Sequence, residues 1–195
     1  MKRAIRFGLL GAAVMVVALP AYAHPGHVEG AGFSAGFMHP LSGWDHFLAM
    51  TTLGLWLGLS NERSKFLSAV AAWTMALTAG FLLGLSGFHL PLVEPGILAT
   101  VLILGLLAAT ATRLSPRVVA PMLAAFAVFH GHAHGTEAPE NAAMLYALGF
   151  VAASIGLIAA SYGAARSIPS QWREAVVRGL GVAIVAAGAI LGFAS

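Results

Sequence analysis

Residues 39 to 60 read HPLSGWDHFLAMTTLGLWLGLS, and this stretch decides the class of fold. Most of it is apolar, as in a helix that crosses a lipid bilayer, which needs about 20 such residues. Its first eight residues nevertheless contain Asp45 and two histidines, His39 and His46. Ionisable residues inside a span are costly and usually lie on an ion or proton path. The stretch therefore predicts a transmembrane helix that carries a functional site near one end.

The composition of the whole chain indicates an integral membrane protein. Of its 195 residues, 59% are hydrophobic and only 9% are charged, whereas soluble domains average about 25% charged residues. A compact chain of this size cannot hide so much apolar surface from water, so the expected partner is the lipid bilayer. The sequence contains no cysteine, which excludes disulfides, thiolate metal sites and thiol catalysis.

The N-terminus has the pattern of a signal peptide. Three basic residues precede an apolar stretch over 7–19, which an Ala-x-Ala cleavage pattern at 21–23 follows. The alternative, an uncleaved first membrane helix, would be short for a bilayer. We expect a signal peptide over 1–23 and a single permease domain over 24–195, with His24 as the mature N-terminus outside the cytoplasm.

The rest of the chain predicts an all-α, polytopic membrane helix bundle. Six apolar spans follow the signal, near 39–60, 66–88, 93–112, 118–135, 141–165 and 175–194. The basic residues of the connections all fall on one side of the predicted bundle: Arg63, Lys65, Arg113, Arg117, Arg166, Arg173 and Arg178. By the positive-inside rule this side is cytoplasmic. The prediction is a bacterial inner-membrane protein with both mature termini in the periplasm. The net charge of +3 then reflects topology and not nucleic-acid binding.

Counting depth along the predicted helices brings distant residues to one level. Asp45 and His46 lie about 10 Å below the outer boundary, at 1.5 Å per residue. His130, counted from the cytoplasmic end of its helix, lies about 12 Å from the same boundary of a 30 Å core. His39 and His134 share a second, shallower level. The histidines thus favour a metal path with a periplasmic entrance.

Spacing within the two helices refines this site. His130 and His134 are i and i+4, so one helical face presents both imidazoles, while His132 points away. His39 and His46 are about 10.5 Å apart along a continuous helix. One ion can be held by both only if the side chains lean together or the helix opens between Pro40 and Gly43. Pro40 itself is expected as the first helical residue.

Several other residues are weaker candidates as metal ligands. They are His132, Glu94 beside Pro95, Glu137 at an outer turn, and His24 and His27 near the mature N-terminus. Imidazole and carboxylate ligands suit Ni²⁺, Co²⁺, Zn²⁺ or Cu²⁺, and the absence of thiolate disfavours Cu⁺.

With these residues in view, the chain closely resembles the HupE/UreJ family of nickel and cobalt permeases. "HPLSGWDH" is similar to the family's HPxxGxDH, and "FHGHAHG" at 129–135 to its FHGxAHG element. The resemblance implies metal handling by His39, Asp45, His46, His130 and His134. It also implies uptake of Ni²⁺, sometimes Co²⁺, for hydrogenase or urease maturation, so the metal is cargo and no resident cofactor or enzyme activity is expected.

The energy for uptake is expected from the membrane potential. The sequence has no P-loop pattern. An inside-negative potential supplies about 4.6 kcal/mol for a divalent ion per 100 mV, which is enough for facilitated diffusion into the cytoplasm.

Two readings from other classes remain open at this stage. "GLSG" at 84–87 is similar to the GxSG of rhomboid intramembrane proteases, with Ser86 as nucleophile and His130 as base. Alternatively, His46 and His130 could be the axial ligands of a haem in an electron carrier, because they share one depth.

Overall fold

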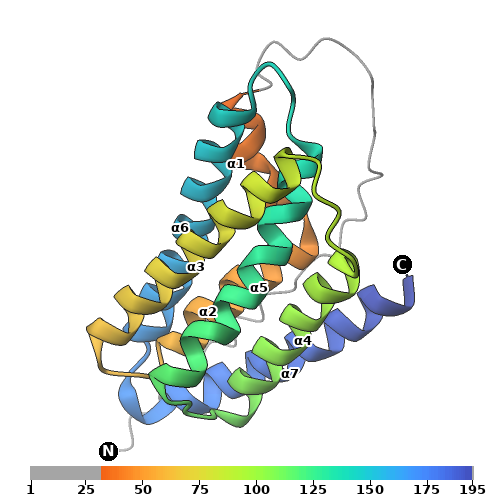
Figure 1. Cartoon of the computed structure of the whole chain (residues 1–195). Helices are drawn as coiled ribbons and strands as arrows, with labels where there is room; N and C mark the ends of the chain where they lie inside the picture. The colour runs from red at the N-terminus through yellow and green to blue at the C-terminus, as the bar shows by residue number, and fades with distance from the viewer. Residues whose placement is uncertain (1–31, 195) are drawn as a thin grey trace, which may run out of the picture.

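A computed structural model describes residues 32–194 of the chain, and all of its regular structure is helical. Seven helices follow one another: α1 (Phe33–Ser42), α2 (Trp44–Leu57), α3 (Arg63–Leu85), α4 (Val93–Thr110), α5 (Pro116–Glu137), α6 (Ala143–Ser167) and α7 (Ser170–Ala194). Figure 1 shows them as one tilted bundle, in which α3 lies beside α5 and α4 beside α7. The predicted signal peptide, His24 and His27 lie outside the described residues.

The first predicted span is wrong in two respects. Helix starts at Phe33, six residues before the predicted boundary, so Pro40 lies inside α1 and is not its first residue. The helix is then interrupted at Gly43, whose extended backbone (φ −80°, ψ 112°) separates α1 from α2. The expected single helix over 39–60 is therefore two short helices, because Gly43 leaves the helical region directly after Ser42.

The later helices follow the prediction more closely. α3 to α7 begin and end within five residues of the spans expected from hydropathy. Among the described helices, α3, α4, α6 and α7 are each long and apolar enough to cross a membrane. α1 and α2 are too short to do so separately, and α5 carries three histidines in its last two turns.

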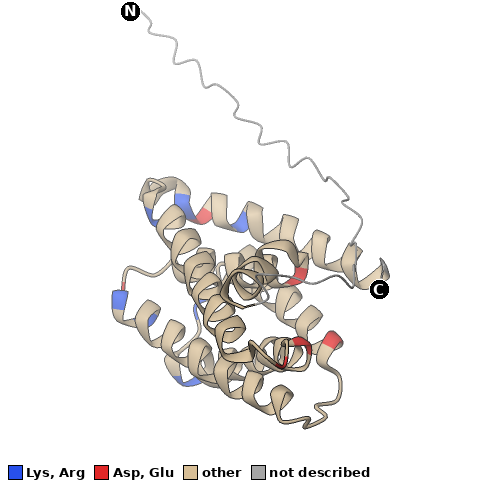
Figure 2. Ribbon diagram, turned by 90° about the horizontal axis from the view of Figure 1, so that it is seen from above, with Lys and Arg blue, Asp and Glu red and all other residues tan. Residues whose placement is uncertain are grey.

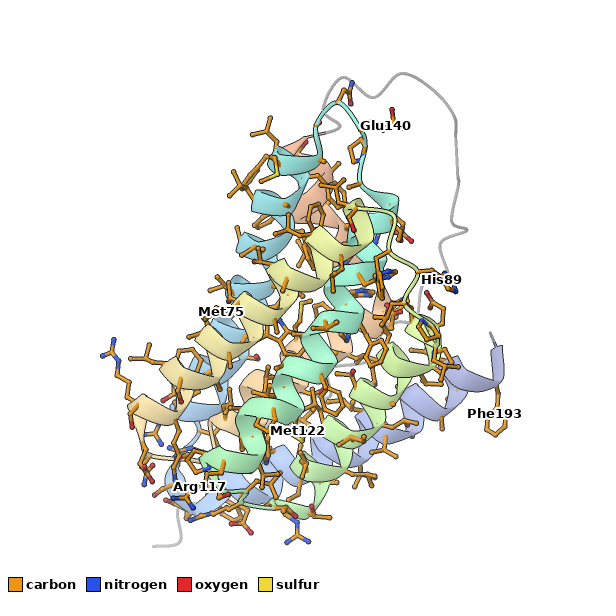
Figure 3. All side chains as sticks on the ribbon, in the orientation of Figure 1. Met75, His89, Arg117, Met122, Glu140 and Phe193 are labelled. Carbon is orange, nitrogen blue, oxygen red and sulfur yellow. The ribbon has the colours of Figure 1, made fainter. Side chains whose placement is uncertain are left out.

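The outer surface of the bundle is that of a membrane protein. Large apolar side chains project outward from most helices, such as Met75, which is 74% exposed, and Phe193, which is 93% exposed (Figure 3). In water such a surface would mark an interaction site. Over long apolar helices it is the surface expected against lipid tails.

Glycines let the central helices approach closely. A Cβ at Gly131 of α5 would lie 2.0 Å from the carbonyl oxygen of Leu77 on α3, and one at Gly80 of α3 would lie 2.3 Å from the carbonyl oxygen of Val128. Gly80 and Gly84, four residues apart on α3, both face α5, and small residues at this spacing permit close contact between membrane helices. This contact fixes the height of α5 against α3.

Charge is distributed unevenly along the bundle. Lys and Arg gather toward one end of the helices, at the left of Figure 2. Figure 3 shows Arg117 at this end and Glu140 at the opposite one. We call the end formed by the start of α3, the start of α5 and the connections before them the basic end.

Candidate metal centre

The histidines predicted as ligands come from three helices that meet far from the basic end. His39 lies in the last turn of α1, His46 in the first turn of α2, and His130 and His134 in the last turns of α5. The break at Gly43 turns the chain between His39 and His46, so the two need not stay 10.5 Å apart as on a straight helix. The spacing left two possibilities open, side chains that lean together or a helix that opens between Pro40 and Gly43. The structure has the opened helix.

The four imidazoles form one continuous cluster, called here the four-histidine cluster. Ring centroids are 4.6 Å apart for His46 and His130, and 4.6 Å apart for His39 and His134. His46 and His134 join the two pairs, with centroids 4.5 Å apart. The pairs are the same two that the depth count placed at a deep and a shallow level.

Half of the ring nitrogens in the cluster are buried and have no hydrogen-bond partner among the described residues. This is true of Nε2 of His46, Nε2 of His134 and both ring nitrogens of His130. Buried polar atoms are nearly always hydrogen-bonded, so four unpaired nitrogens in one place require an explanation. In a neutral imidazole one of the two nitrogens carries a free lone pair, and that nitrogen is the donor that a divalent transition metal takes.

Asp45 is directed at His46 and not at the centre of the cluster. Its Oδ1 accepts a hydrogen bond from the backbone N–H of His46 at 2.7 Å and lies 2.7 Å from His46 Nδ1. An ionised carboxylate can only accept, so Nδ1 carries the proton and the Nε2 lone pair is left free toward the cluster. The carboxylate therefore sets the tautomer and the orientation of this imidazole.

A second group lies at the outer edge of the cluster. One ligand atom each from His39, His134 and Glu137 lie within 4.8 Å of one another. His39 Nε2 is 3.4 Å from Oε2 of Glu137, whose side chain is exposed. This geometry brings Glu137, a weaker sequence candidate, into contact with the cluster.

The comparisons with known proteins agree with the motifs. Residues 12–191 match the family described as HupE / UreJ protein. The chain belongs to the HupE/UreJ family. It is also 35% identical over 190 residues, 96% of this chain and 98% of the relative, to "Protein HupE" of Rhizobium leguminosarum bv. viciae. No solved structure matches this chain.

His132 of the HupE/UreJ motif "FHGHAHG" lies outside the cluster, as its spacing predicted. Its Nε2 is 2.7 Å from the carbonyl oxygen of Phe88 and 3.3 Å from the backbone nitrogen of Leu90. The shorter contact makes Nε2 a donor to the Phe88 carbonyl. His132 thus ties α5 to the α3–α4 connection.

Glu94, the remaining weak candidate within residues 32–194, is not brought to the cluster. Glu94 is exposed in the first turn of α4, and it is not in the ligand group that contains Glu137. His89 is exposed in the α3–α4 connection (Figure 3).

The geometry does not fit either rival reading. The Ser86 hydroxyl is exposed at the end of α3 and donates to the carbonyl of Leu83 at 2.7 Å. His130 is fully buried and has no hydrogen bond to it, so the described residues contain no Ser86–His130 pair. His46 and His130 are in edge contact, which leaves no room for a macrocycle between them.

Two aromatic residues at the cluster were missed by the sequence reasoning. The Tyr146 hydroxyl of α6 lies 3.4 Å from His134 Nδ1, and the Trp73 ring of α3 lies 5.5 Å from that of His130. The Trp73 indole nitrogen is buried and also has no partner among the described residues. A tyrosine or tryptophan within an apolar span is the available signal, because a buried polar tip needs a partner.

Proposed function

We propose that this chain is a secondary permease that imports Ni²⁺, with Co²⁺ as a second cargo, from the periplasm to the cytoplasm. It would not be an enzyme and would need no resident cofactor. The ion would be bound on its way by His39, His46, His130 and His134, with Asp45 acting on His46. The family resemblance further implies that the metal serves hydrogenase or urease maturation.

One observation carries this proposal: the unpaired, buried ring nitrogens of the four-histidine cluster. Buried ring nitrogens that have no hydrogen bond to lose are suited to receive an ion that has given up its water. Neutral imidazoles leave the charge of the ion uncompensated. The carboxylates of Asp45 and Glu137, both at the cluster, supply the negative charge.

Direction and topology follow from the positive-inside rule, which supports placing the basic end in the cytoplasm. We propose six membrane spans, with α1 and α2 together forming the first and α5 the fourth. They would follow a cleaved signal peptide over 1–23 in the bacterial inner membrane, with the mature N-terminus and the C-terminus in the periplasm. The ion would then enter at the four-histidine cluster.

Passage to the basic end requires rearrangement of the bundle. On the basic side of the cluster, α2 and α3 contribute Met50, Leu53 and Leu77, all with no exposed surface. No ion crosses such packing without a conformational change. Facilitated diffusion in this protein would therefore alternate between a state open to the cluster and a state open to the basic end.

Uptake of ⁶³Ni²⁺ by cells that lack other nickel importers tests the proposal. Cells with the wild-type chain should accumulate the isotope, and His46→Asn or His130→Asn should reduce accumulation to the level of cells without the protein, at equal abundance in the membrane. His89→Asn, at an exposed histidine outside the cluster, is the matched control and should transport normally. Wild-type uptake by both cluster variants would disprove the role of the cluster.

A further inference from the structure

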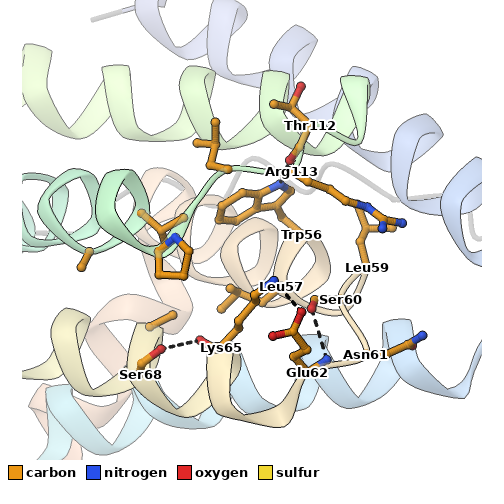
Figure 4. A pocket seen from close by; sticks show the side chains of 15 residues that line it. Trp56, Leu57, Leu59, Ser60, Asn61, Glu62, Lys65, Ser68, Thr112 and Arg113 are labelled. Carbon is orange, nitrogen blue, oxygen red and sulfur yellow. Dashed lines mark hydrogen bonds and ion pairs between the residues drawn. The ribbon is translucent and has the colours of Figure 1, made fainter.

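A cavity of about 360 Å³ lies at the basic end of the bundle, far from the four-histidine cluster. It is bounded by the ends of α2 and α4 and by the starts of α3 and α5 (Figure 4). Its volume falls within the range of small-molecule sites, about 300–1,000 Å³. Neither the family motifs nor the proposed ion site uses this cavity.

The inner wall of the cavity is apolar and well ordered by packing. Trp56, Leu57 and Ala69 line it and are themselves buried. The Trp56 indole N–H donates to the Thr112 carbonyl at 2.8 Å, which holds the ring in place between α2 and the end of α4. Leu114 and Val119 continue this apolar wall on the other side.

The mouth of the cavity carries more positive than negative charge. Lys65 and Arg113 line it, and Arg166 donates hydrogen bonds to two further lining residues, Ser60 and Asn61. The only carboxylate among the lining residues is Glu62, whose Oε1 lies 2.6 Å from Lys65 Nζ. Arg113 has no ion pair or hydrogen bond within residues 32–194. A cation would be repelled here, which argues against a second binding site for the transported metal.

An anion with an apolar tail satisfies both parts of this cavity. We propose that it binds one anionic phospholipid, with the phosphate at Arg113 and Lys65 and part of an acyl chain against Trp56 and Leu114. Basic pockets between membrane helices are suited to anionic headgroups, and each basic residue near a membrane surface contributes about 1 kcal/mol of attraction to them. Binding of the lipid depends neither on the proposed topology nor on metal transport. The proposed topology decides only that the lipid would come from the cytoplasmic leaflet.

Native mass spectrometry of the purified full chain in detergent tests the site. The protein is mixed with equal amounts of phosphatidylglycerol and phosphatidylcholine, and the lipids that survive detergent removal in the gas phase are counted. The wild type should retain one phosphatidylglycerol in clear excess over phosphatidylcholine. Arg113→Gln should lower this retention about fivefold, the factor that corresponds to about 1 kcal/mol.

Two further variants separate a cavity from a general surface effect. Arg63 is exposed at the start of α3, at the basic end, but does not line the cavity. The Arg63→Gln variant should therefore retain the lipid as the wild type does. Ala120→Trp should exclude the lipid, because Ala120 lies in the cavity wall and a large side chain there fills the space. Melting curves of each variant without added lipid check that all are folded.

Several outcomes would overturn the proposal. Equal retention of the two lipids would show that charge does not select the occupant. Unchanged retention by both Arg113→Gln and Ala120→Trp would place the lipid elsewhere. Displacement of the lipid by millimolar inorganic phosphate would indicate a site for soluble anions, and displacement by Ni²⁺ would assign the cavity to the metal path.

Discussion

Asp45 is placed to act on the proposed metal path through His46, because its carboxylate is directed at that residue. Its carboxylate contacts both nitrogens of His46 that face away from the cluster, the backbone N–H and Nδ1. The consequence for the site is a fixed tautomer at His46 and a negative charge close to the deep pair, His46 and His130. Loss of such a partner behind a histidine ligand usually costs 10- to 100-fold in metal affinity or activity.

We therefore expect Asp45→Asn to lower ⁶³Ni²⁺ uptake at scarce metal by about 10- to 100-fold. The amide keeps the size of the side chain and an oxygen acceptor but removes the charge, so abundance in the membrane should not change. Initial rates of uptake over a range of Ni²⁺ concentrations measure the effect. Glu140→Gln, which removes an exposed carboxylate at the same end of the bundle, should transport like the wild type, and wild-type rates for Asp45→Asn would refute the assignment.

Two histidines of one motif should respond differently to the same substitution. His130→Asn should abolish uptake. His132→Asn should leave uptake near normal but lower the free energy of unfolding by about 0.5–1.5 kcal/mol, because it loses the hydrogen bond to Phe88. Uptake assays and denaturation in detergent, made on both variants, check this. A severe loss of uptake in His132→Asn, at normal stability, would show that His132 handles the ion.

Among the helices, the sequence predicts residue positions that follow from the regular helical repeat. It does not predict positions that depend on a break in a helix or on contact with a neighbouring helix. The pairing of His130 with His134 follows from the helical repeat alone, and the depth count brought His130 to His46 across two helices. From the sequence, a break at Gly43 is possible but cannot be predicted, since Pro40 and the apolar residues after it also suit a continuous helix.

Tyr146 could not be placed because its position depends on tertiary contact. It reaches the cluster from α6, where Gly36 of α1 lies directly against its backbone: a Cβ at Gly36 would be 1.9 Å from the Tyr146 carbonyl oxygen. Hydropathy identifies both helices but does not give their rotation about their own axes. That rotation is set by such small-residue contacts.

The glycine contact between α3 and α5 leads to a prediction about stability. Gly131→Ala should lower the free energy of unfolding by about 1–3 kcal/mol, because its Cβ would lie 2.0 Å from a backbone oxygen that cannot move without shifting α3. Gly156→Ala is the control: nothing lies within 4 Å of a Cβ there, so stability should be unchanged or slightly higher. Melting temperatures of the two variants in one detergent measure the difference, and equal values would show that α3 and α5 are not in this close contact.

For the molecule as a whole, the chain separates two chemistries along the bundle. The four-histidine cluster and the carboxylates of Asp45 and Glu137 beside it lie toward one end. Lys and Arg gather toward the other end (Figure 2). Buried apolar side chains fill the space between them. A divalent cation is attracted at the first end and repelled at the second. In the proposed uptake, this arrangement would favour binding at the cluster and would leave no second binding site at the basic end.

The orientation of this arrangement in the membrane can be tested directly, because the chain has no cysteine of its own. Ser64 is exposed in the first turn of α3, at the basic end, and Asn141 is exposed between α5 and α6, near the opposite end. In intact spheroplasts, a membrane-impermeant maleimide should label Asn141→Cys and should reach Ser64→Cys only after the membrane is permeabilised. The physical reason is the positive-inside rule, which retains the arginine-rich connections in the cytoplasm.

Labelling of Ser64→Cys alone in intact spheroplasts would reverse the bundle, place the four-histidine cluster at the cytoplasmic face and turn the proposed importer into an exporter. Labelling of both from one side would mean that α3 to α5 do not make an odd number of crossings, and the assignment of six spans would fail with it.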